Sequence, residues 1–214
     1  IKSAFQEFVD KLPENGKIIS HEDVEFEGGH IHYTTEGLDR SKIALSVLGA
    51  HNKENAALAL TLGEALGLPL EEAYKGLLTF RGTWRRLEYK GVWHDVALYD
   101  DYGHHPAEIK ATLQALREKY PEEKYKIIAV FQPHLFSRTK EHLEEWVESF
   151  EDATTVCVLP IYAAREKDDG SISSEDVVEK MHNAVCMQSF DEVKDYVLKN
   201  PHYNTVLITI GAGN

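Results

Sequence analysis

The strongest constraint on the fold is a regular alternation of strand-like and helix-like segments from residue 96 to residue 210. Short apolar runs rich in β-branched residues predict strands, and apolar residues at helical spacing predict the helices between them. The predicted strands are 96–101, 125–132, 154–160, 184–188 and 205–210, and the predicted helices are 106–120, 140–151, 173–183 and 191–200. This alternation predicts an α/β fold with right-handed crossovers and a mostly parallel, Rossmann-like sheet covered by helices on both faces.

The first 80 residues have a different pattern. It predicts a helix ending at Pro13 and Gly16, a strand at 17–20, a hairpin at 24–35 and a buried strand at 42–48. An Ala- and Leu-rich helix follows at 52–67, with Gly67 at its C-terminal end, and Pro69 opens another helix. Residues 81–91 are basic and aromatic without helical period, so we expect a junction there, with domains at 1–83 and 84–214.

Composition narrows the class of protein. The chain has 214 residues, 43% of them hydrophobic and 28% charged, as in ordinary soluble globular proteins. The net charge of −13 argues against nucleic acid as a partner. No apolar run approaches the roughly 20 residues of a membrane helix, so we expect no membrane partner. Cys157 and Cys186 lie in apolar runs that read as buried strands, which fits reduced thiols and a cytoplasmic location.

Polar clusters follow three of the predicted strands. They are "DDYGHHP" from Asp100, "QPHLFSRTK" from Gln132 and "PIYAAREKDDG" from Pro160. In open α/β sheets, ligands bind outside the carboxyl ends of the strands. We therefore expect these three loops to converge on one edge of the sheet and to form a site there.

The first cluster admits several interpretations. Gly103 allows a tight turn, and Pro106 favours an extended conformation at His105. An aspartate or histidine before a helix can act simply as an N-cap. Two histidines beside two aspartates exceed that need and suit proton transfer near neutral pH. A dinuclear metal site is a further alternative, although the spacing matches no common metal motif.

The other polar residues favour anion and nucleotide binding. Arg138 has a planar guanidinium that can bind two oxygens of a carboxylate or phosphate, and a cation at a helix start favours a bound anion. Arg85 and Arg86 at the junction could form surface ion pairs or neutralise a transferred phosphoryl group. Asn52 could be a helix N-cap, and Asn55, on the same helix face, could bind a base or ribose. No P-loop pattern occurs, and the G-x-G at 211–213 is too short for a dinucleotide fingerprint.

Five motifs, in their order and approximate spacing, resemble the Mur ligases of peptidoglycan synthesis. They are "GAHNKENAALAL", "FRGTWRRLE", "YDDYGHHPAEIKATLQALR", "FQPHLFSRTK" and "IYAARE". The match is closest to the members that join L-alanine to UDP-N-acetylmuramate. The patterns HNxxN, here "HNKEN", and RRxE, here "RRLE", are shared more widely in the family. One departure is Leu135, which stands where the family usually has a second arginine. The stretch between residues 19 and 49 also looks short for the family.

The resemblance implies an ATP-dependent carboxylate–amine ligase that works through an acyl phosphate, with ATP, Mg²⁺, UDP-N-acetylmuramate and L-alanine as ligands. It implies that residues 1–83 are part of the central ATPase domain, without the P-loop that would help hold Mg²⁺, and that 84–214 are the C-terminal domain. Asn52, Asn55 and Arg86 would contact ATP, and Arg86, Asp101 and His104 would serve catalysis. Tyr102, His134 and Arg138 would bind substrate, with Arg138 on the carboxylate of the amino acid.

Three alternatives remain at this point. A muropeptide-recycling ligase of the same superfamily shares the "HHP" stretch but lacks the "FQPH..SRT" piece. A ligase-derived domain could bind nucleotide or a peptidoglycan precursor without catalysis. A metal-dependent hydrolase could use the histidines and aspartates of the rim. Because the P-loop is lacking, we expect no ATP hydrolysis or ligation by this chain alone.

Overall fold

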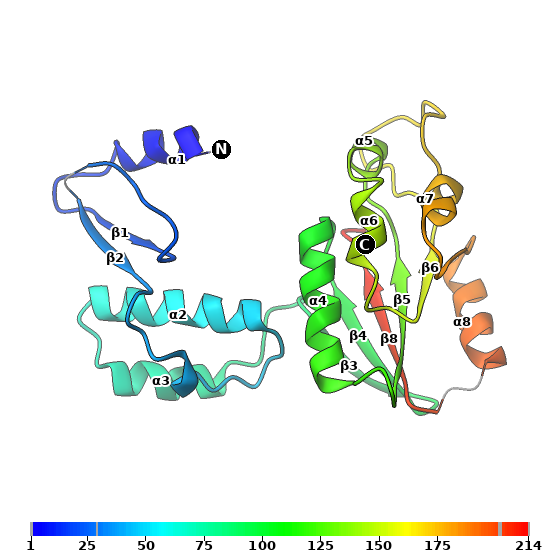
Figure 1. Ribbon diagram of the computed structural model, residues 1–214, viewed down its shortest axis with the longest axis horizontal. Coiled ribbons are helices and arrows are strands. Elements are labelled where there is room, and N and C mark those ends of the chain that lie inside the picture. Colours follow the sequence, from blue (N-terminus) through cyan, green and yellow to red (C-terminus); the bar gives the residue numbers. More distant parts are fainter. Residues whose placement is uncertain (1, 29, 201–202, 214) are drawn as a thin grey trace. The chain divides into compact units, whose positions relative to one another are not determined.

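The computed structural model describes residues 2–28, 30–200 and 203–213, and the chain divides into two compact units, Ile1–Arg81 and Gly82–Asn214. The boundary lies two residues before the position expected from the sequence. Figure 1 labels the helices and strands of both units. Among the described residues, no helix combines the length and the apolar character needed to cross a membrane.

The first unit contains three α-helices and one pair of short strands. Its elements are α1 (Lys2–Val9), β1 (Lys17–Ser20), β2 (Ile31–Thr34), the 3₁₀ turn Arg40–Lys42, α2 (Ala50–Ala65) and α3 (Leu70–Thr79). Helices α2 and α3 lie side by side (Figure 1) and bury the small core of this unit between them and the preceding loop. That core consists of Ile43, Ala56, Ala57 and Leu60.

The end of α2 explains the glycine that follows it. Gly67 has a φ of 75°, and its amide donates to the Glu64 carbonyl at 2.9 Å. The next amide, of Leu68, donates to the Gly63 carbonyl at 2.9 Å. This pair of bonds is a Schellman motif, which requires the left-handed conformation that glycine adopts without strain. The expected C-terminal glycine is therefore confirmed.

Two predictions for the first unit are wrong. Residues 24–35 do not form a hairpin, because β2 pairs in parallel with β1, with Lys17 opposite Ile31 and Ser20 opposite Thr34. Residues 43–48 are not a strand, although Ile43 is buried against α2. An apolar run becomes a strand only where a neighbouring strand accepts its hydrogen bonds, and none of the described residues pairs with 43–48.

The second unit is a six-stranded sheet with helices on both faces, as the alternation predicts. The strands are β3 (Glu88–Trp93), β4 (Val96–Asp101), β5 (Lys126–Phe131), β6 (Thr155–Val158), β7 (Ala184–Cys186) and β8 (Thr205–Ile210). The helices are α4 (Pro106–Lys119), α5 (Phe136–Glu141), α6 (Glu145–Ser149), α7 (Ser174–Lys180) and α8 (Phe190–Lys199). The strand order is β3-β4-β8-β5-β6-β7, and all neighbours are parallel except β3 and β4.

The two faces of this sheet carry separate cores (Figure 1). Helices α4, α6 and α7 cover one face through fully buried residues such as Leu113, Trp146 and Val177. Helix α8 covers the other face through Val193 and Val197, which pack with Val130 and Cys157. Alternate residues of β5 serve the two cores, as the period of two in a strand requires. The central strands are therefore buried on both sides and fix their carboxyl ends in space.

Two details of the second unit differ from the sequence expectations. Strand β3 begins inside the segment 81–91 expected to be an irregular junction and continues to Trp93. Its register shifts between Tyr89 and Gly91, which interrupts the alternating pattern. The helix expected at 140–151 is two short helices, α5 and α6. The helix is interrupted at His142, between α5 and α6. The centre of the His142 ring lies 4.8 Å from that of the His105 ring and 5.8 Å from that of the Trp146 ring.

Candidate active site

The polar clusters gather at the carboxyl edge of the parallel strands, as expected. Strands β4 and β5 flank β8, so the loops after Asp101, Phe131 and Ile210 leave the sheet next to one another. Backbone bonds tie these loops together: the Gly211 amide donates to the Asp101 carbonyl at 3.1 Å, and the Gln132 amide donates to the Ile210 carbonyl at 3.0 Å. The second unit thus presents one continuous polar edge.

Asp101 is buried at this edge, with 3% of its surface exposed. Its two oxygens each accept a backbone amide at 2.7 Å, one from Leu87 and one from Gly103. Burial raises the pKa of this carboxyl, while the two amide donors act in the opposite direction. Gly103 is needed because a Cβ there would lie 2.8 Å from the nearer Asp101 oxygen. Asp101 therefore anchors both flanking loops.

Tyr102 and the arginine pair form the next part of the edge. The guanidinium of Arg85 lies 5.1 Å from the Tyr102 ring centre and that of Arg86 lies 5.8 Å from it, within cation–π range. Arg86 is exposed and lies 3.7 Å from the Glu108 carboxylate of α4. The surface ion pair leaves the Arg86 guanidinium accessible to an anion.

The two adjacent histidines have different surroundings. The Nδ1 atom of His105 accepts from the Ala107 amide at 3.3 Å, so His105 is the N-cap of α4. His104 lies with its Nδ1 atom 3.1 Å from the Tyr102 carbonyl oxygen and its ring 5.5 Å from the Tyr102 ring. A carbonyl only accepts hydrogen bonds, so the neutral His104 ring carries its proton on Nδ1 and leaves Nε2 as an acceptor. The capping interpretation is confirmed for His105.

The second polar loop brings His134 and Arg138 to the same edge. The His134 ring lies 5.7 Å from that of Tyr162, and the Leu135 amide donates to the Tyr162 carbonyl at 2.9 Å. Burial lowers the pKa of His134, and the charges of Arg138 and His104 lower it further. The loops that carry His104 and His134 follow β4 and β5, which both flank β8, so both loops leave the sheet at the same edge.

Leu135 has a strained backbone in this loop. Its φ is 71° at the N-cap of α5, a value that costs a non-glycine residue free energy. The side chain is buried, at 7% exposure. Nothing in the sequence indicated this conformation.

Asn52 and Asn55 lie in the first turns of α2, in the first unit. The expectation that Asn52 caps the helix is wrong, because Gly49 is the N-cap. The side-chain Nδ2 of Asn52 donates back to the Leu48 carbonyl at 2.6 Å. Asn55 is exposed one turn further along the same face. Both residues belong to the first unit, whereas the polar edge described above belongs to the second.

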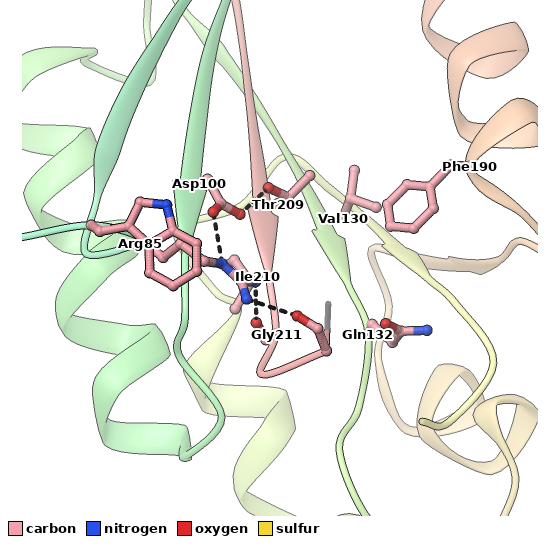
Figure 2. Close-up of a pocket in the computed structure, with 10 residues that line it drawn as sticks. Arg85, Asp100, Val130, Gln132, Phe190, Thr209, Ile210 and Gly211 are labelled. Carbon is pink, nitrogen blue, oxygen red and sulfur yellow. Dashed lines mark hydrogen bonds and ion pairs between the residues drawn. The ribbon is translucent and has the colours of Figure 1, made fainter. Parts of the chain in front are cut away.

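A cavity of about 440 Å³ adjoins the edge on the α8 face of the sheet (Figure 2). Arg85 lines this cavity, and the ion-pair interpretation offered for it from the sequence is confirmed. The guanidinium binds the Asp100 carboxylate at 2.9 Å and the Gly211 and Gly213 carbonyls at 2.7 Å each. Arg85 therefore joins the loop before β3, strand β4 and the loop after β8.

The charged and titratable side chains described at this edge are mainly arginines and histidines. Across residues 2–28, 30–200 and 203–213, no three His, Cys, Asp or Glu side chains gather closely enough to hold a metal ion. The arrangement instead suits a small anion held by arginine, with two imidazoles close by. The second unit is thus a mostly parallel α/β domain with arginine and histidine side chains at the carboxyl edge of its strands, which is where ligands bind in folds of this class.

Comparison with known proteins gives the family. Residues 85–213 match the family model described as "Mur ligase, glutamate ligase domain". The chain belongs to the Mur ligase family, as the motifs indicated.

Curated relatives extend this assignment. The UDP-N-acetylmuramate–L-alanine ligase of Caldanaerobacter subterraneus is 44% identical over 174 residues, which cover 79% of this chain and 37% of that protein. The enzyme of the same name from Acetivibrio thermocellus is 34% identical over 253 residues, covering 100% of this chain and 53% of that protein. The chain thus spans about half or less of the length of these relatives. The alignment with the Acetivibrio enzyme is 253 positions long, which is 39 more than the 214 residues of this chain. At those 39 positions the relative has residues that this chain lacks.

Solved structures agree on the fold. The UDP-N-acetylmuramate–alanine ligase of Thermotoga maritima has a TM-score of 0.63 at 28% identity, over 79% of this chain and 36% of that one. The MurF structure of Acinetobacter baumannii has a TM-score of 0.73 over 98% of this chain and 51% of that one, and at 18% identity it shows the fold alone.

Proposed function

We propose that this chain carries the amino-acid side of an ATP-dependent amide-bond ligase that joins L-alanine to UDP-N-acetylmuramate in peptidoglycan precursor synthesis. The observation that supports the proposal is that the loops after β4 and β5, which carry His104, His134 and Arg138, leave the sheet at the same carboxyl edge. The relatives that are 44% and 34% identical bear the name of this ligase, which favours it over a muropeptide-recycling enzyme.

Arg138 binds the carboxylate of the incoming amino acid. Its guanidinium has no hydrogen-bond or ion-pair partner among the described residues, although it is only partly exposed. A guanidinium in that position is stabilised by a ligand carboxylate through two parallel hydrogen bonds. The amino group of the amino acid, one carbon away, is then held near the two imidazoles.

His104 and His134 have different proposed roles toward the amino acid and the acyl group. The ammonium group of the amino acid must lose a proton before its nitrogen can attack an acyl carbon, and Nε2 of His104 is the acceptor for that proton. His134 has a buried Nδ1 atom with no partner among the described residues, so its proton lies on Nε2, from where it donates to a substrate oxygen. Its lowered pKa keeps the ring neutral near pH 7.

Arg86, Tyr102 and Asp101 form the side of the site that faces the activated carboxyl group. Arg86 offers an accessible cation to phosphate oxygens, and Tyr102 fixes its position through the ring contact at 5.8 Å. Asp101 holds the loop that carries both Tyr102 and His104. Its role is thus proposed to be the placement of neighbouring groups.

In the first unit, Asn52 and Asn55 are proposed to contact the adenine of ATP. An amide side chain both donates and accepts, as the edge of an adenine requires. Asn55 is exposed and suited to that contact, whereas Asn52 already donates to the Leu48 carbonyl and has its oxygen left to accept. ATP is the phosphoryl donor in this scheme, and Mg²⁺ would shield its charges.

The first test is Arg138→Ala in a full-length ligase that carries these residues. The KM for L-alanine should rise about 10- to 100-fold, since a hydrogen-bonded pair with a charged group contributes about 1.5–3 kcal/mol. The KM for UDP-N-acetylmuramate should stay within a factor of two, and Arg81→Ala, in the first unit, serves as the matched control. Phosphate release gives both constants. An unchanged KM for L-alanine would remove Arg138 from the site.

The second test uses the 214-residue chain alone. We expect no hydrolysis of ATP above background, because no P-loop pattern occurs in the sequence. Phosphate release with ATP, Mg²⁺, L-alanine and UDP-N-acetylmuramate is the measurement. Sustained turnover would show that this chain contains a complete phosphate-binding site of another kind.

A further inference from the structure

The loop after β6 is fastened to the loop after β5 at two points. The Tyr162 amide donates to the Pro133 carbonyl at 2.8 Å, and the Leu135 amide donates back to the Tyr162 carbonyl at 2.9 Å. Four residues further on, the Glu166 carboxylate accepts the Ser137 amide at 3.0 Å and also the Ser137 hydroxyl. The segment 162–166 therefore runs along the loop that carries His134 and the first turn of α5.

Arg165 lies inside this fastened segment, next to Glu166. The carboxylate oxygens of Glu166 are both used by Ser137, and the bonds to Ser137 lower the pKa of Glu166. Arg165 itself is exposed. Its position is set by its neighbours on either side, while its guanidinium remains accessible.

Arg138 and Arg165 differ from the other arginines of the chain. Among the described residues, neither has a hydrogen-bond or ion-pair partner for its side chain. Every other arginine contacts an acceptor, at positions 40, 81, 85, 86 and 117. The two unpartnered guanidinium groups are also the two whose charges lower the pKa of His134, together with that of His104, while Glu166 acts in the opposite sense. Ser137 and Glu166, the chain neighbours of these two arginines, are hydrogen-bonded to each other, and His134 pairs with Tyr162 in parallel, so the two arginines stand on loop segments that run side by side.

Two unpartnered cations on adjoining loop segments repel each other, and an anion between them relieves the repulsion. A carboxylate has two oxygens and one negative charge, and each oxygen can accept from a different guanidinium. Leu135 lies between His134 and α5. Its side chain is buried and apolar, so it provides neither a positive charge nor a hydrogen-bond donor for such an anion. The exposed guanidinium on the adjoining segment is that of Arg165.

We propose that Arg165 is a second substrate-binding residue, which together with Arg138 binds the carboxylate of the incoming amino acid. The proposal rests on the proposed function for the identity of the amino acid, but not for the binding of a carboxylate. It assigns to the loop after β6 a part in selecting substrates, because a ligand without a free carboxylate would leave two cations unpaired.

The experiment is a titration of the 214-residue chain, labelled with ¹⁵N, in which the Nε–Hε signals of Arg138 and Arg165 are followed by NMR. The probes are L-alanine, propionate and L-alaninamide, which lacks the carboxylate. We expect Arg165→Gln to raise the Kd for L-alanine and for propionate about tenfold or more. Arg165→Lys should restore part of the affinity, and binding of L-alaninamide should not depend on position 165.

The matched control is Lys167→Gln, which removes one positive charge from the same loop at an exposed position two residues away. It should change the Kd for L-alanine less than twofold. A second readout does not involve binding: Arg165→Gln should raise the pKa of His134, measured from its ring proton signals, and Lys167→Gln should not.

The outcomes separate the two proposals. Dependence on Arg165 for propionate, with no preference for L-alanine, would keep the role of Arg165 and reject L-alanine as the substrate. An unchanged Kd for both carboxylates in Arg165→Gln, an equal loss in Lys167→Gln, or no saturable shift of either arginine signal would overturn the role of Arg165. An Arg138-dependent affinity for L-alanine would still support the proposed function in the first of these cases.

Discussion

The two units of the chain differ in how their apolar residues are used. In the second unit, the central strands are buried on both faces, and residues such as Phe150, Trp146 and Leu113 are almost fully enclosed. In the first unit, the strands have four residues each, and two phenylalanines of α1, Phe5 and Phe8, are 58% and 69% exposed. The comparison teaches that a helix–strand alternation determines a fold when each element has a partner for its apolar face.

The largest expected effect comes from a matched pair of phenylalanine substitutions. Phe150→Ala should lower the free energy of unfolding of the second unit by about 3–5 kcal/mol, because it opens a cavity beside Phe131 and Trp146. Phe8→Ala, in the first unit, should change stability by no more than about 0.5 kcal/mol. Urea denaturation followed by tryptophan fluorescence reports on the second unit, which contains Trp84, Trp93 and Trp146.

Equal losses from these two variants would break the comparison, since they would mean that Phe8 is as well packed as Phe150. Circular dichroism in the same urea series follows the helices of the first unit, and it provides the check that Phe8→Ala leaves them folded.

An intermediate effect is expected from Arg85, whose guanidinium joins three segments of the second unit. Arg85→Gln should cost about 2 kcal/mol, between the values for exposed and for fully buried ion pairs, because Asp100 and two carbonyls lose a charged donor. Arg85→Lys should recover only part of this, since an ammonium cannot match the fork geometry. Thermal unfolding measures both. A neutral Arg85→Gln would show that the loops before β3 and after β8 hold together without it.

The smallest effect is expected at Cys157, which lies in the interior of the second unit. Burial raises the pKa of this thiol to about 11, so at pH 8 it stays protonated as well as enclosed. It should react with a thiol reagent only when the second unit unfolds, and the rate should increase in Phe150→Ala. Mass spectrometry of the labelled protein distinguishes it from the less buried Cys186. Rapid labelling of Cys157 in folded protein would contradict the packing of β6.

Much of the second unit could be predicted from the sequence, and much of the first unit could not. Parallel strands buried on both faces give apolar runs such as 126–131, which the pattern detects directly. The segment 24–35 alternates like a hairpin strand, but its pairing partner is β1 in a parallel register. Local alternation does not specify which strand becomes the neighbour. The error arises because strand pairing depends on tertiary contacts that the local pattern does not contain.

The candidate site shows a similar limit. That the loops after β4 and β5 would share an edge followed from the topology of parallel strands, and the structure confirms it. The anchoring of Asp101 by two backbone amides, the strained Leu135 and the support from Arg85 did not follow. Each depends on contacts between segments distant in sequence, or on a backbone angle that the residue type disfavours.

The position of β8 has a consequence for synthesis of the protein. Residues 205–210 form the strand that lies between β4 and β5, so during translation those two strands emerge from the ribosome more than 70 residues before the strand that joins them. Until then, the facing edges of β4 and β5 carry unsatisfied amides and carbonyls, which can pair with other nascent chains. The second unit must therefore complete its sheet after translation of β8, and the polar edge assembles only in that last step.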